Sequence, residues 1–421
     1  MFKSPRGTQD ILPADQPYWD YVRGTARRVA AQFGFGRIET PMFETTDLFQ
    51  RGVGDETDIV QKEMYSFEDN GGDMITLRPE GTASVCRAYI EHGMHNLPQP
   101  VRQFYLAPMF RYERPQAGRL RQHHQFGAEV IGDSSASVDA EVIELGYRYL
   151  SQLGLSGFRL RLNSLADPEE RKPYLATLHE YFSKYADELP KVDLARLERA
   201  PLRLLDSKEP ATRKIGEDAP RSLDYLGTAS REHWDELLAL LDNLKKIYPQ
   251  FEYEIDHRLV RGLDYYNRTV FEFEPYGARS QGTILAGGRY DPLIEILGGP
   301  STPGIGFGSG IERIILELKE QQVSIPATTG LNAVIVSVGM ARQQAARLAA
   351  TLRASGLSAI LAPERSFKAQ MRFANQSGAA NAVILGEREL ESGTVAVKPL
   401  ETDAPQYEVT LEGVAARLRA R

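Results

Sequence analysis

Two segments of the 421-residue chain place arginines beside other polar side chains in a spacing that suits the binding of anions. In residues 110–115, Arg111 and Glu113 lie two positions apart, so their side chains would share one face of a strand. A planar guanidinium at this position can hold a phosphate through two parallel hydrogen bonds. The alternative is a surface Arg–Glu ion pair, which contributes only about 0–1 kcal/mol to stability.

The second segment, residues 259–266, sets Arg261 close to the hydroxyls of Tyr265 and Tyr266. A cation beside phenol groups suits a carboxylate or the phosphate of a transition state. A structural cation–π contact is the alternative. Together, the two segments predict an adenylating enzyme.

Further polar residues gather near these segments in the sequence. The loop 114–121 carries Arg114, Gln116 and Arg119, a set that suits an RNA end but also occurs in ordinary solvated turns. Gln125 and Glu129 lie four positions apart and would share one face of a strand. With Glu80, Gly81 and Thr82 they offer acceptors for a ligand ammonium or an imidazole N–H, although a lone buried Gln is usually a satisfied core residue.

Two glycine-rich stretches predict close approach of the backbone to a ligand. Residues 304–310 are read as a glycine-rich turn that leads into a helix carrying Arg313, and residues 286–290 form a second such stretch. Neither fits the G-x-G-x-x-G fingerprint or the P-loop, so the nucleotide-binding folds defined by those motifs are disfavoured.

The elements that must position these residues are predicted from hydrophobic periodicity and turn residues. Between residues 168 and 245 the chain changes to a helical pattern rich in Leu, Glu, Lys and Arg, which indicates a helical insertion. The rest of the first core, which closes near residue 320, is expected to be an antiparallel sheet with helices. Its expected elements are a helix at 18–33, an extended segment at 37–41, a hairpin within 64–77 that turns at 69–73, strands at 101–110 and 125–131, sheet patterning at 253–273 and after 281, and a helix at 311–319.

A second domain is expected after a linker at 324–330, because strands and helices alternate from there on. This order predicts a small α/β domain with a mainly parallel sheet. The segment 331–421 carries eleven Lys and Arg against eight Asp and Glu, while the whole chain has a net charge of −7. The expected elements are strands at 333–338, 357–362 and 382–385 and helices at 343–354 and 367–377.

The composition is that of a globular protein, with 42% apolar and 25% charged residues. No apolar run of about 18 residues is present, so no membrane segment is expected. The N-terminus lacks the pattern of a secretory signal, which predicts a cytoplasmic protein. The one cysteine, Cys86, excludes an intramolecular disulfide and cannot alone build a zinc site, so no metal site is expected from cysteines. A small buried hydrophobe is its expected role rather than a nucleophile.

Taken together, these segments resemble the histidyl-tRNA synthetases, a class II family, over essentially the whole chain. The strings 259–266 and 285–291 separate this family from other class II enzymes. The other strings that carry the resemblance are 6–13, 51–58, 77–82, 110–129 as motif two and 304–313 as motif three.

The resemblance implies an α/β fold class with an α+β catalytic core, in which helices flank an antiparallel sheet. It implies a catalytic domain at 1–325 with the helical insertion at about 168–245, and an α/β anticodon-binding domain at 331–421. Pro41 is similar to the motif-one proline of the dimer interface, so a homodimer is implied. The insertion would contact the acceptor stem of the tRNA.

The resemblance also implies roles for the polar residues. The function it implies is ATP-dependent activation of L-histidine to histidyl-adenylate, followed by transfer to tRNA(His), with Mg²⁺ bridging the phosphates. His123 stands where family members commonly carry Phe against the adenine. The implied roles are Arg111, Glu113 and Arg313 for ATP, Glu80, Thr82 and Gln125 for the histidine amino group, Glu129 and Tyr266 for the imidazole, Gly81 and Tyr265 for histidine without a specified group, Arg261 for the carboxylate and α-phosphate, and Arg114, Gln116 and Arg119 for the tRNA end.

Two other functions compete with this one. A non-catalytic, synthetase-like regulatory subunit of histidine biosynthesis keeps the core fold but generally lacks the C-terminal domain. A plain RNA-binding module would not need the set formed by Glu80, Gln125, Glu129 and Arg261.

Overall fold

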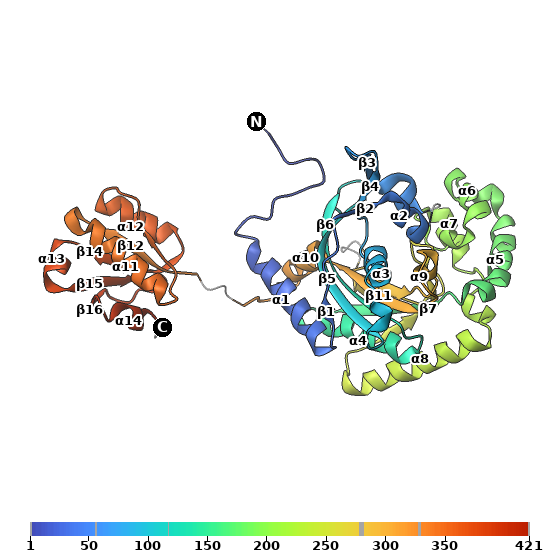
Figure 1. The fold of residues 1–421 in the computed structure, drawn as a ribbon. Coiled ribbons are helices and arrows are strands. Elements are labelled where there is room, and N and C mark those ends of the chain that lie inside the picture. The colour runs from blue at the N-terminus through green and yellow to red at the C-terminus, as the bar shows by residue number, and fades with distance from the viewer. Residues whose placement is uncertain (1, 55–56, 117, 278–281, 327–329, 420–421) are drawn as a thin grey trace. The chain divides into compact units, whose positions relative to one another are not determined.

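The computed structural model describes residues 2–54, 57–116, 118–277, 282–326 and 330–419. Parts of three expected segments therefore lie outside the described residues, namely Asp55 and Glu56, Ala117, and 327–329 of the linker. The chain forms two compact units that divide between Ile325 and Pro326 (Figure 1), and each unit has its own apolar core.

The first unit is built on an eight-stranded sheet in the order β1-β5-β6-β11-β10-β9-β7-β8. Its neighbouring strands are antiparallel except in the edge pairs β1–β5 and β7–β8. This arrangement confirms the predicted antiparallel sheet. The strands are β1 (Gly36–Arg37), β5 (Val101–Phe110), β6 (Gln122–Ile131), β7 (Phe158–Ser164), β8 (Tyr253–Ile255), β9 (Asn267–Pro275), β10 (Leu285–Arg289) and β11 (Gly304–Gly310).

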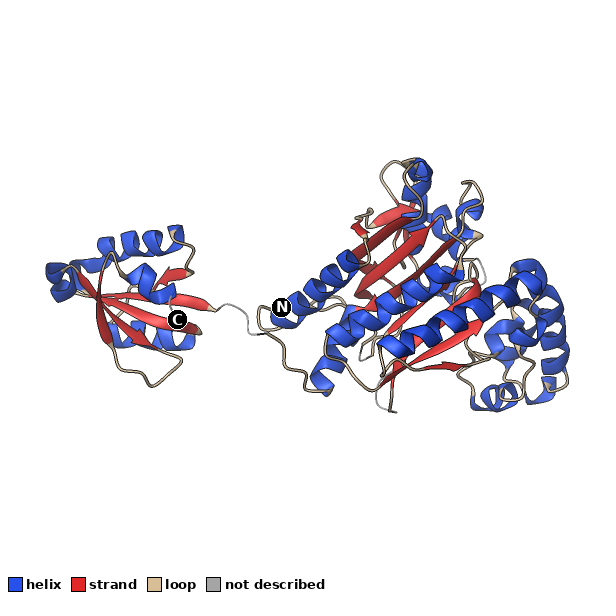
Figure 2. Ribbon diagram, turned by 90° about the horizontal axis from the view of Figure 1, so that it is seen from below, coloured by secondary structure: helices blue, strands red, loops and turns tan. Residues whose placement is uncertain are grey.

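Helices lie across one face of this sheet (Figure 2). Those that share its apolar core on that face are α1 (Gln16–Gln32), α4 (Ala136–Gln152), α8 (Thr228–Ile247) and α10 (Ile311–Glu320). Their apolar side chains recur at spacings of three and four, so each helix turns one stripe toward the strands. The expected helices at 18–33 and 311–319 are confirmed within two residues. The buried residues of this stripe include Val22, Val29, Val142, Tyr149, Leu237, Leu241, Ile314 and Leu318.

The opposite face packs against α3 (Thr82–Glu91) and α9 (Leu293–Ile296), and this core continues into the helical segment. That segment contains α5 (Pro168–Ser183), α6 (Lys191–Arg199) and α7 (Pro210–Gly216), which lie together beside the sheet in Figure 1. A separate small sheet, in the order β2-β4-β3, lies next to α2 (Thr46–Val53). It contains the predicted hairpin, and its strands are β2 (Phe43–Thr45), β3 (Tyr65–Glu68) and β4 (Met74–Leu77).

Several expectations for the first unit were wrong in detail. The glycine-rich stretch at 304–310 is a strand, β11, because it pairs along its whole length with β6 and β10. Strand β6 begins at Gln122, three residues early, since its first residues pair with the end of β5. Residues 256–266 form a loop between β8 and β9, and of the extended segment at 37–41 only Arg37 is paired in a strand.

The second unit has a five-stranded sheet in the order β13-β12-β14-β15-β16. Its first three strands are parallel, as expected, but β15 and β16 join antiparallel and were not predicted. No helix in the described part of the chain is long and apolar enough to cross a membrane. The elements are β12 (Leu331–Ser337), α11 (Arg342–Ala354), β13 (Ala359–Leu361), α12 (Phe367–Gln376), β14 (Ala379–Leu385), α13 (Glu387–Ser392), β15 (Thr394–Pro399), β16 (Tyr407–Thr410) and α14 (Val414–Arg419).

Candidate active site

A cavity of about 430 Å³ lies over β6, β9, β10 and β11. Eight of the predicted residues do not line it. Arg114 and Gln116 are exposed, and Gln116 borders a separate cavity beside Trp19. The other six are Glu80, Gly81, Thr82, Glu129, Tyr265 and Tyr266, which are buried. The predicted residues that do line the cavity are Arg111, Glu113, Arg119, Gln125, Arg261 and Arg313. Folding thus brings together cations that are spread over two hundred positions of the sequence.

Strand pairing sets the floor of this cavity. In the register of β6 and β11, Gln125 lies opposite Gly310 and Glu129 lies opposite Gly306. Gln125 and Glu129 share one face of β6, as the period of two predicts. A Cβ atom at Gly306 would lie 1.8 Å from Oε2 of Glu129, so only glycine leaves room for this carboxyl group. The glycine-rich strand therefore leaves room for the carboxyl group of Glu129 on the face of β6 that carries Gln125, a residue of the cavity lining.

Glu129 is 1% exposed and is held by hydroxyl groups. Its Oε1 accepts a hydrogen bond of 2.8 Å from Thr82, and its Oε2 accepts one of 2.7 Å from Tyr290. Burial raises the pKa of Glu129 to about 8, even though these hydrogen bonds oppose the shift. A buried carboxyl group held by hydroxyls can bind a donor such as an imidazole N–H.

Glu80, Gly81 and Thr82 form the turn that begins α3. The carboxylate of Glu80 accepts the backbone N–H of Thr82 at 2.7 Å and that of Ala83 at 2.8 Å, which satisfies two donors of the first helical turn. Burial raises the pKa of Glu80 as well. A Cβ atom at Gly81 would lie 2.3 Å from Cζ of Tyr105, so this position needs glycine. The turn ties α3 to the carboxyl group of Glu129 through Thr82.

Arg261 forms an ion pair with Glu272, which also accepts a hydrogen bond of 2.7 Å from Thr283. Burial alone would lower the pKa of Arg261, but the charge of Glu272 raises it above its usual value. Among the described residues, Nε of Arg261 and the hydroxyl of Tyr265 are buried without a hydrogen-bond partner. Buried polar atoms normally have partners, so this edge of the cavity is suited to a polar ligand.

Tyr266 lies beside this arginine, with its ring centroid 5.7 Å from Cζ of Arg261. The structural cation–π contact considered from the sequence is therefore present. It leaves Nε of Arg261 unpaired, so the contact and ligand binding are compatible.

Four further arginines border the cavity, namely Arg111, Arg119, Arg161 and Arg313. The first two and Arg313 are held by backbone carbonyls or have only distant carboxylate partners. Nε of Arg111 donates to the carbonyl of Pro79 at 2.7 Å. Arg313 donates to two carbonyl groups, and its pKa is lowered by burial and by the charge of Arg119. The carboxylate of Glu113 lies 3.6 Å from Arg119 and 4.0 Å from Arg111. The cavity lining as a whole balances six Lys and Arg against six Asp and Glu, but Arg111, Arg119 and Arg313 outnumber Glu113 where they meet. This group of arginines suits a polyphosphate.

His123 also lines the cavity. Burial lowers its pKa to about 3, and the charge of Arg111 acts in the same direction. The imidazole is therefore neutral at physiological pH and offers a flat, uncharged face. A charged ring here would repel the neighbouring arginines.

Sequence reasoning missed several residues of the cavity wall. Glu272 and Glu274 alternate with Phe271 and Phe273 along β9, so the carboxylates line the cavity while the rings enter the core on the other face. That period of two was a signal in the sequence. Tyr290 had no such signal, because only the fold shows that its hydroxyl reaches Glu129.

A second cavity, of about 530 Å³, lies between the helical segment and residues 58–63. It is larger, but Arg111 is the only predicted site residue in its lining. It shares four residues with the first cavity, Glu63, Arg111, Asp206 and Lys208, and its wall includes Arg196 and Arg203. Cys86 lies outside both cavities, and burial raises the pKa of its thiol, so the expected role as a buried hydrophobe is confirmed.

Comparisons with known proteins cover both units. Residues 7–314 match the family model described as Histidyl-tRNA synthetase, and residues 332–421 match that described as Anticodon binding domain. A histidine–tRNA ligase of Dehalococcoides mccartyi is 47% identical over 100% of this chain and 99% of the relative. One of Caldanaerobacter subterraneus is 46% identical over 96% of each chain. The crystal structure of apo histidyl-tRNA synthetase from S. aureus has a TM-score of 0.83 at 36% identity and covers 100% of both chains.

Proposed function

The chain belongs to the histidyl-tRNA synthetase family, and we propose that it activates L-histidine with ATP to histidyl-adenylate and transfers the histidyl group to tRNA(His). It is thus an aminoacyl-tRNA ligase. The main support for the proposal is the cavity that Arg261 lines together with the arginine cluster, which comprises Arg111, Arg119 and Arg313. Nε of Arg261 is buried there without a hydrogen-bond partner among the described residues. Such a site suits two anions, the carboxylate of an amino acid and the triphosphate of ATP.

ATP would lie with its phosphates against the arginine cluster. Arg111 would hold the α-phosphate and Arg313 the γ-phosphate, since both guanidinium groups are fixed in the cavity wall by carbonyl groups. The neutral ring of His123 would stack on the adenine. The oxygens of Glu113 fit a Mg²⁺ ion, because they have only long contacts to arginines. That ion would neutralise charge on the phosphates.

Histidine would lie across the glycine-rich floor. Glu129 and Tyr266 would bind the imidazole, and the unpaired hydroxyl of Tyr265 is available beside them. Gln125, with Glu80 and Thr82, would hold the amino group. Because Glu80 already accepts two backbone N–H groups, it would act mainly through its charge.

The first step joins two negatively charged groups, since a histidine carboxylate oxygen attacks the α-phosphorus and pyrophosphate leaves. Arg261 would touch the carboxylate and the α-phosphate, where charge builds up during in-line attack. Its ion pair with Glu272 sets the guanidinium in place before the reaction. Cations positioned in advance lower the barrier without reorganisation during the reaction.

The second step needs the tRNA, and several parts of the chain support its binding. Arg114 and Gln116 are exposed, and Arg119 borders the ATP site, so this loop can reach the acceptor end. We assign residues 1–325 to catalysis, with the insertion at about 168–245 contacting the acceptor stem. Residues 331–421 would read the anticodon, in line with the match to the anticodon-binding model.

We further propose a homodimer in the cytoplasm, where tRNA is charged. The small sheet near Pro41 exposes large apolar side chains, including Met42, Phe43 and Phe67, each about half exposed. An exposed apolar patch of this kind is typical of a protein interface.

The regulatory-subunit alternative is disfavoured, because the similar histidine–tRNA ligases are matched over both units. Charging of tRNA(His) with radiolabelled histidine, ATP and Mg²⁺ by the purified chain tests the proposal. We expect histidyl-tRNA to accumulate in the presence of ATP and not in its absence. A folded protein that charges no tRNA(His) under any condition would contradict the proposed function.

A further inference from the structure

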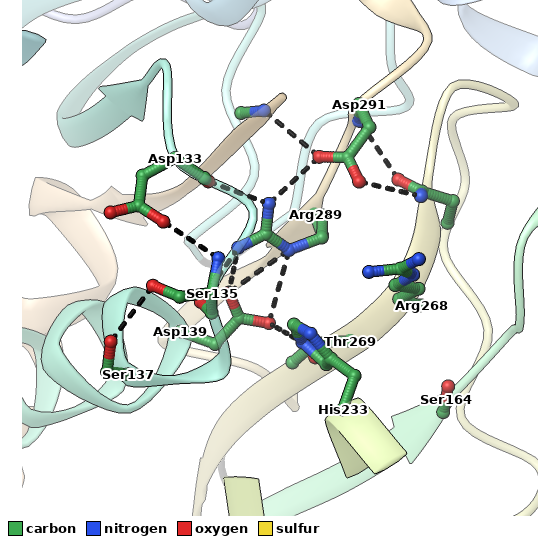
Figure 3. Close-up of polar contacts among 12 residues, drawn as sticks. Asp133, Ser135, Ser137, Asp139, Ser164, His233, Arg268, Thr269, Arg289 and Asp291 are labelled. Atoms are coloured by element: carbon green, nitrogen blue, oxygen red, sulfur yellow. Dashed lines mark hydrogen bonds and ion pairs between the residues drawn. The ribbon is translucent and has the colours of Figure 1, made fainter. Parts of the chain in front are cut away.

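A buried polar network surrounds Arg289, the last residue of β10 (Figure 3). Arg289 and Asp139 of α4 are both 0% exposed and form an ion pair. Nη1 of Arg289 also donates to Asp291 at 2.9 Å and to the carbonyl of Asp133 at 3.0 Å. Burial alone would raise the pKa of Asp139, but Arg289 and His233 hold it below its usual value.

At two places in the chain, a residue of this network is the direct sequence neighbour of a residue of the proposed histidine pocket. Tyr290, which follows Arg289, donates to Glu129. Nδ2 of Asn267, the residue after Tyr266, donates to the carboxylate of Asp291 at 3.1 Å, and its side-chain Oδ1 accepts the backbone N–H of Asp291 at 2.9 Å. The residues next to the network therefore shape the proposed imidazole site.

The strand pairing is irregular at this place. The register of β9 and β10 shifts between Gly288 and Arg289, which leaves Arg268 and Thr269 as extra residues on β9. Arg268 has a φ of 43°, an unusual value for a residue with a side chain. Its guanidinium is held by Asp167 through hydrogen bonds of 2.8–3.0 Å. Side chains therefore fix a bulge two residues after Tyr266.

Both ends of the helical insertion attach to these residues. At its start, Asp167 precedes α5 and binds Arg268 and Asn267. One turn later, Nη2 of Arg171 donates to the carbonyl of Tyr266 at 2.6 Å. In its last helix, α8, which also covers the sheet, Nε2 of His233 lies 2.8 Å from Asp139.

We propose that Arg171 and His233 are positioning residues, which transmit the position of the helical insertion to Tyr266 and Tyr290 in the histidine pocket. The inference rests on the proposed function, since it concerns the binding of histidine. The insertion is anchored at both ends to one network, and each anchor leads to one wall of the pocket. Loss of either anchor would therefore change the affinity for histidine rather than that for ATP, because the insertion residues that line the cavity assigned to ATP, Asp206 and Lys208, lie in another part of the insertion.

The test compares Arg171→Met with Lys172→Met in histidine-dependent ATP–pyrophosphate exchange. Arg171→Met removes the donors to three carbonyl groups, those of Leu165, Ala166 and Tyr266. Lys172 is the next residue of α5, exposed and paired only with Glu169 among the described residues, so its variant is the matched control. We expect the KM for histidine to rise about 2- to 30-fold in Arg171→Met, which is the usual range for coupling between sites. The KM for ATP should stay unchanged in both variants.

A second pair keeps the test valid if Arg171→Met does not fold. His233→Leu should raise the KM for histidine. His233→Gln keeps a donor that reaches Asp139, so its KM for histidine should stay close to that of the unaltered chain. In a Tyr290→Phe background, His233→Leu should add little, because residues that act through one another are not additive. Folded variants with an unchanged KM for histidine, or equal losses in both KM values, would overturn the inference. Absence of histidine-dependent exchange in the unaltered chain would instead count against the proposed function.

Discussion

Replacement of Arg261 by alanine is the sharpest test of the proposed chemistry. The variant removes the guanidinium whose Nε has no partner among the described residues and leaves the rest of the cavity wall in place. We expect kcat/KM for histidine activation to fall about 10²- to 10³-fold, the loss typical of one donor to a developing negative charge. This corresponds to about 2.7–4 kcal/mol of transition-state stabilisation.

The effect on folding should be smaller, because Glu272 keeps other partners. After the substitution it still accepts the hydroxyl of Thr283 at 2.7 Å, and Nη1 of Arg161 lies 3.8 Å away. The free energy of unfolding should fall by about 1–3 kcal/mol, the cost of leaving a buried polar group less well paired. A loss of activity much larger than the loss of stability would therefore reflect chemistry.

The assay is ATP–pyrophosphate exchange with histidine, measured beside the thermal unfolding of each variant. Arg261→Lys keeps the charge but has no planar group with several fixed donors, so its activity should be intermediate. Arg159→Ala is the control, since this arginine forms ion pairs with Glu254 and Glu274 and does not line the cavity. Near-normal exchange by Arg261→Ala would refute the role given to this residue.

Three further predictions concern protonation, the second unit and assembly. The pKa of Glu129 is about 8 in the folded chain against 4.5 for the free group, so the folded state keeps a proton that the unfolded chain loses, and stability should fall as the pH rises between these values. Glu129→Gln should flatten that dependence in thermal unfolding measured at a series of pH values, and an unchanged slope would contradict the assignment. Deletion of 331–421 should leave histidine-dependent exchange intact and impair charging of tRNA(His), whereas equal loss of both activities would show that the second unit is needed for catalysis. Phe43→Glu should halve the mass measured by light scattering, and an unchanged mass would place the dimer interface elsewhere.

Local patterns predicted the parts of the site that depend on strand periodicity. Gln125 and Glu129 share a face because successive side chains of a strand alternate, and the pairing of β6 with β11 follows that rule. The hairpin between β3 and β4 was predicted from its turn residues, and Oδ1 of Asp69 accepts the N–H of Gly71 there. Such features depend on a few neighbouring residues only.

Features that depend on distant parts of the chain were not predicted. The glycine-rich strand β11 was taken for a turn, because glycine disfavours strands unless another group approaches closely. That group is the carboxyl of Glu129, which the sequence alone does not place beneath Gly306. The ion pair of Arg289 with Asp139 joins residues 150 positions apart, and no local pattern signals it.

The most direct test of the central claim is ATP–pyrophosphate exchange with each of the common amino acids, using the purified full-length chain. Exchange with histidine and with no other amino acid is the predicted result, because a pocket built around buried polar groups leaves them unpaired with an apolar side chain. Exchange with several amino acids, or with none, would contradict the assignment of this cavity to histidine activation.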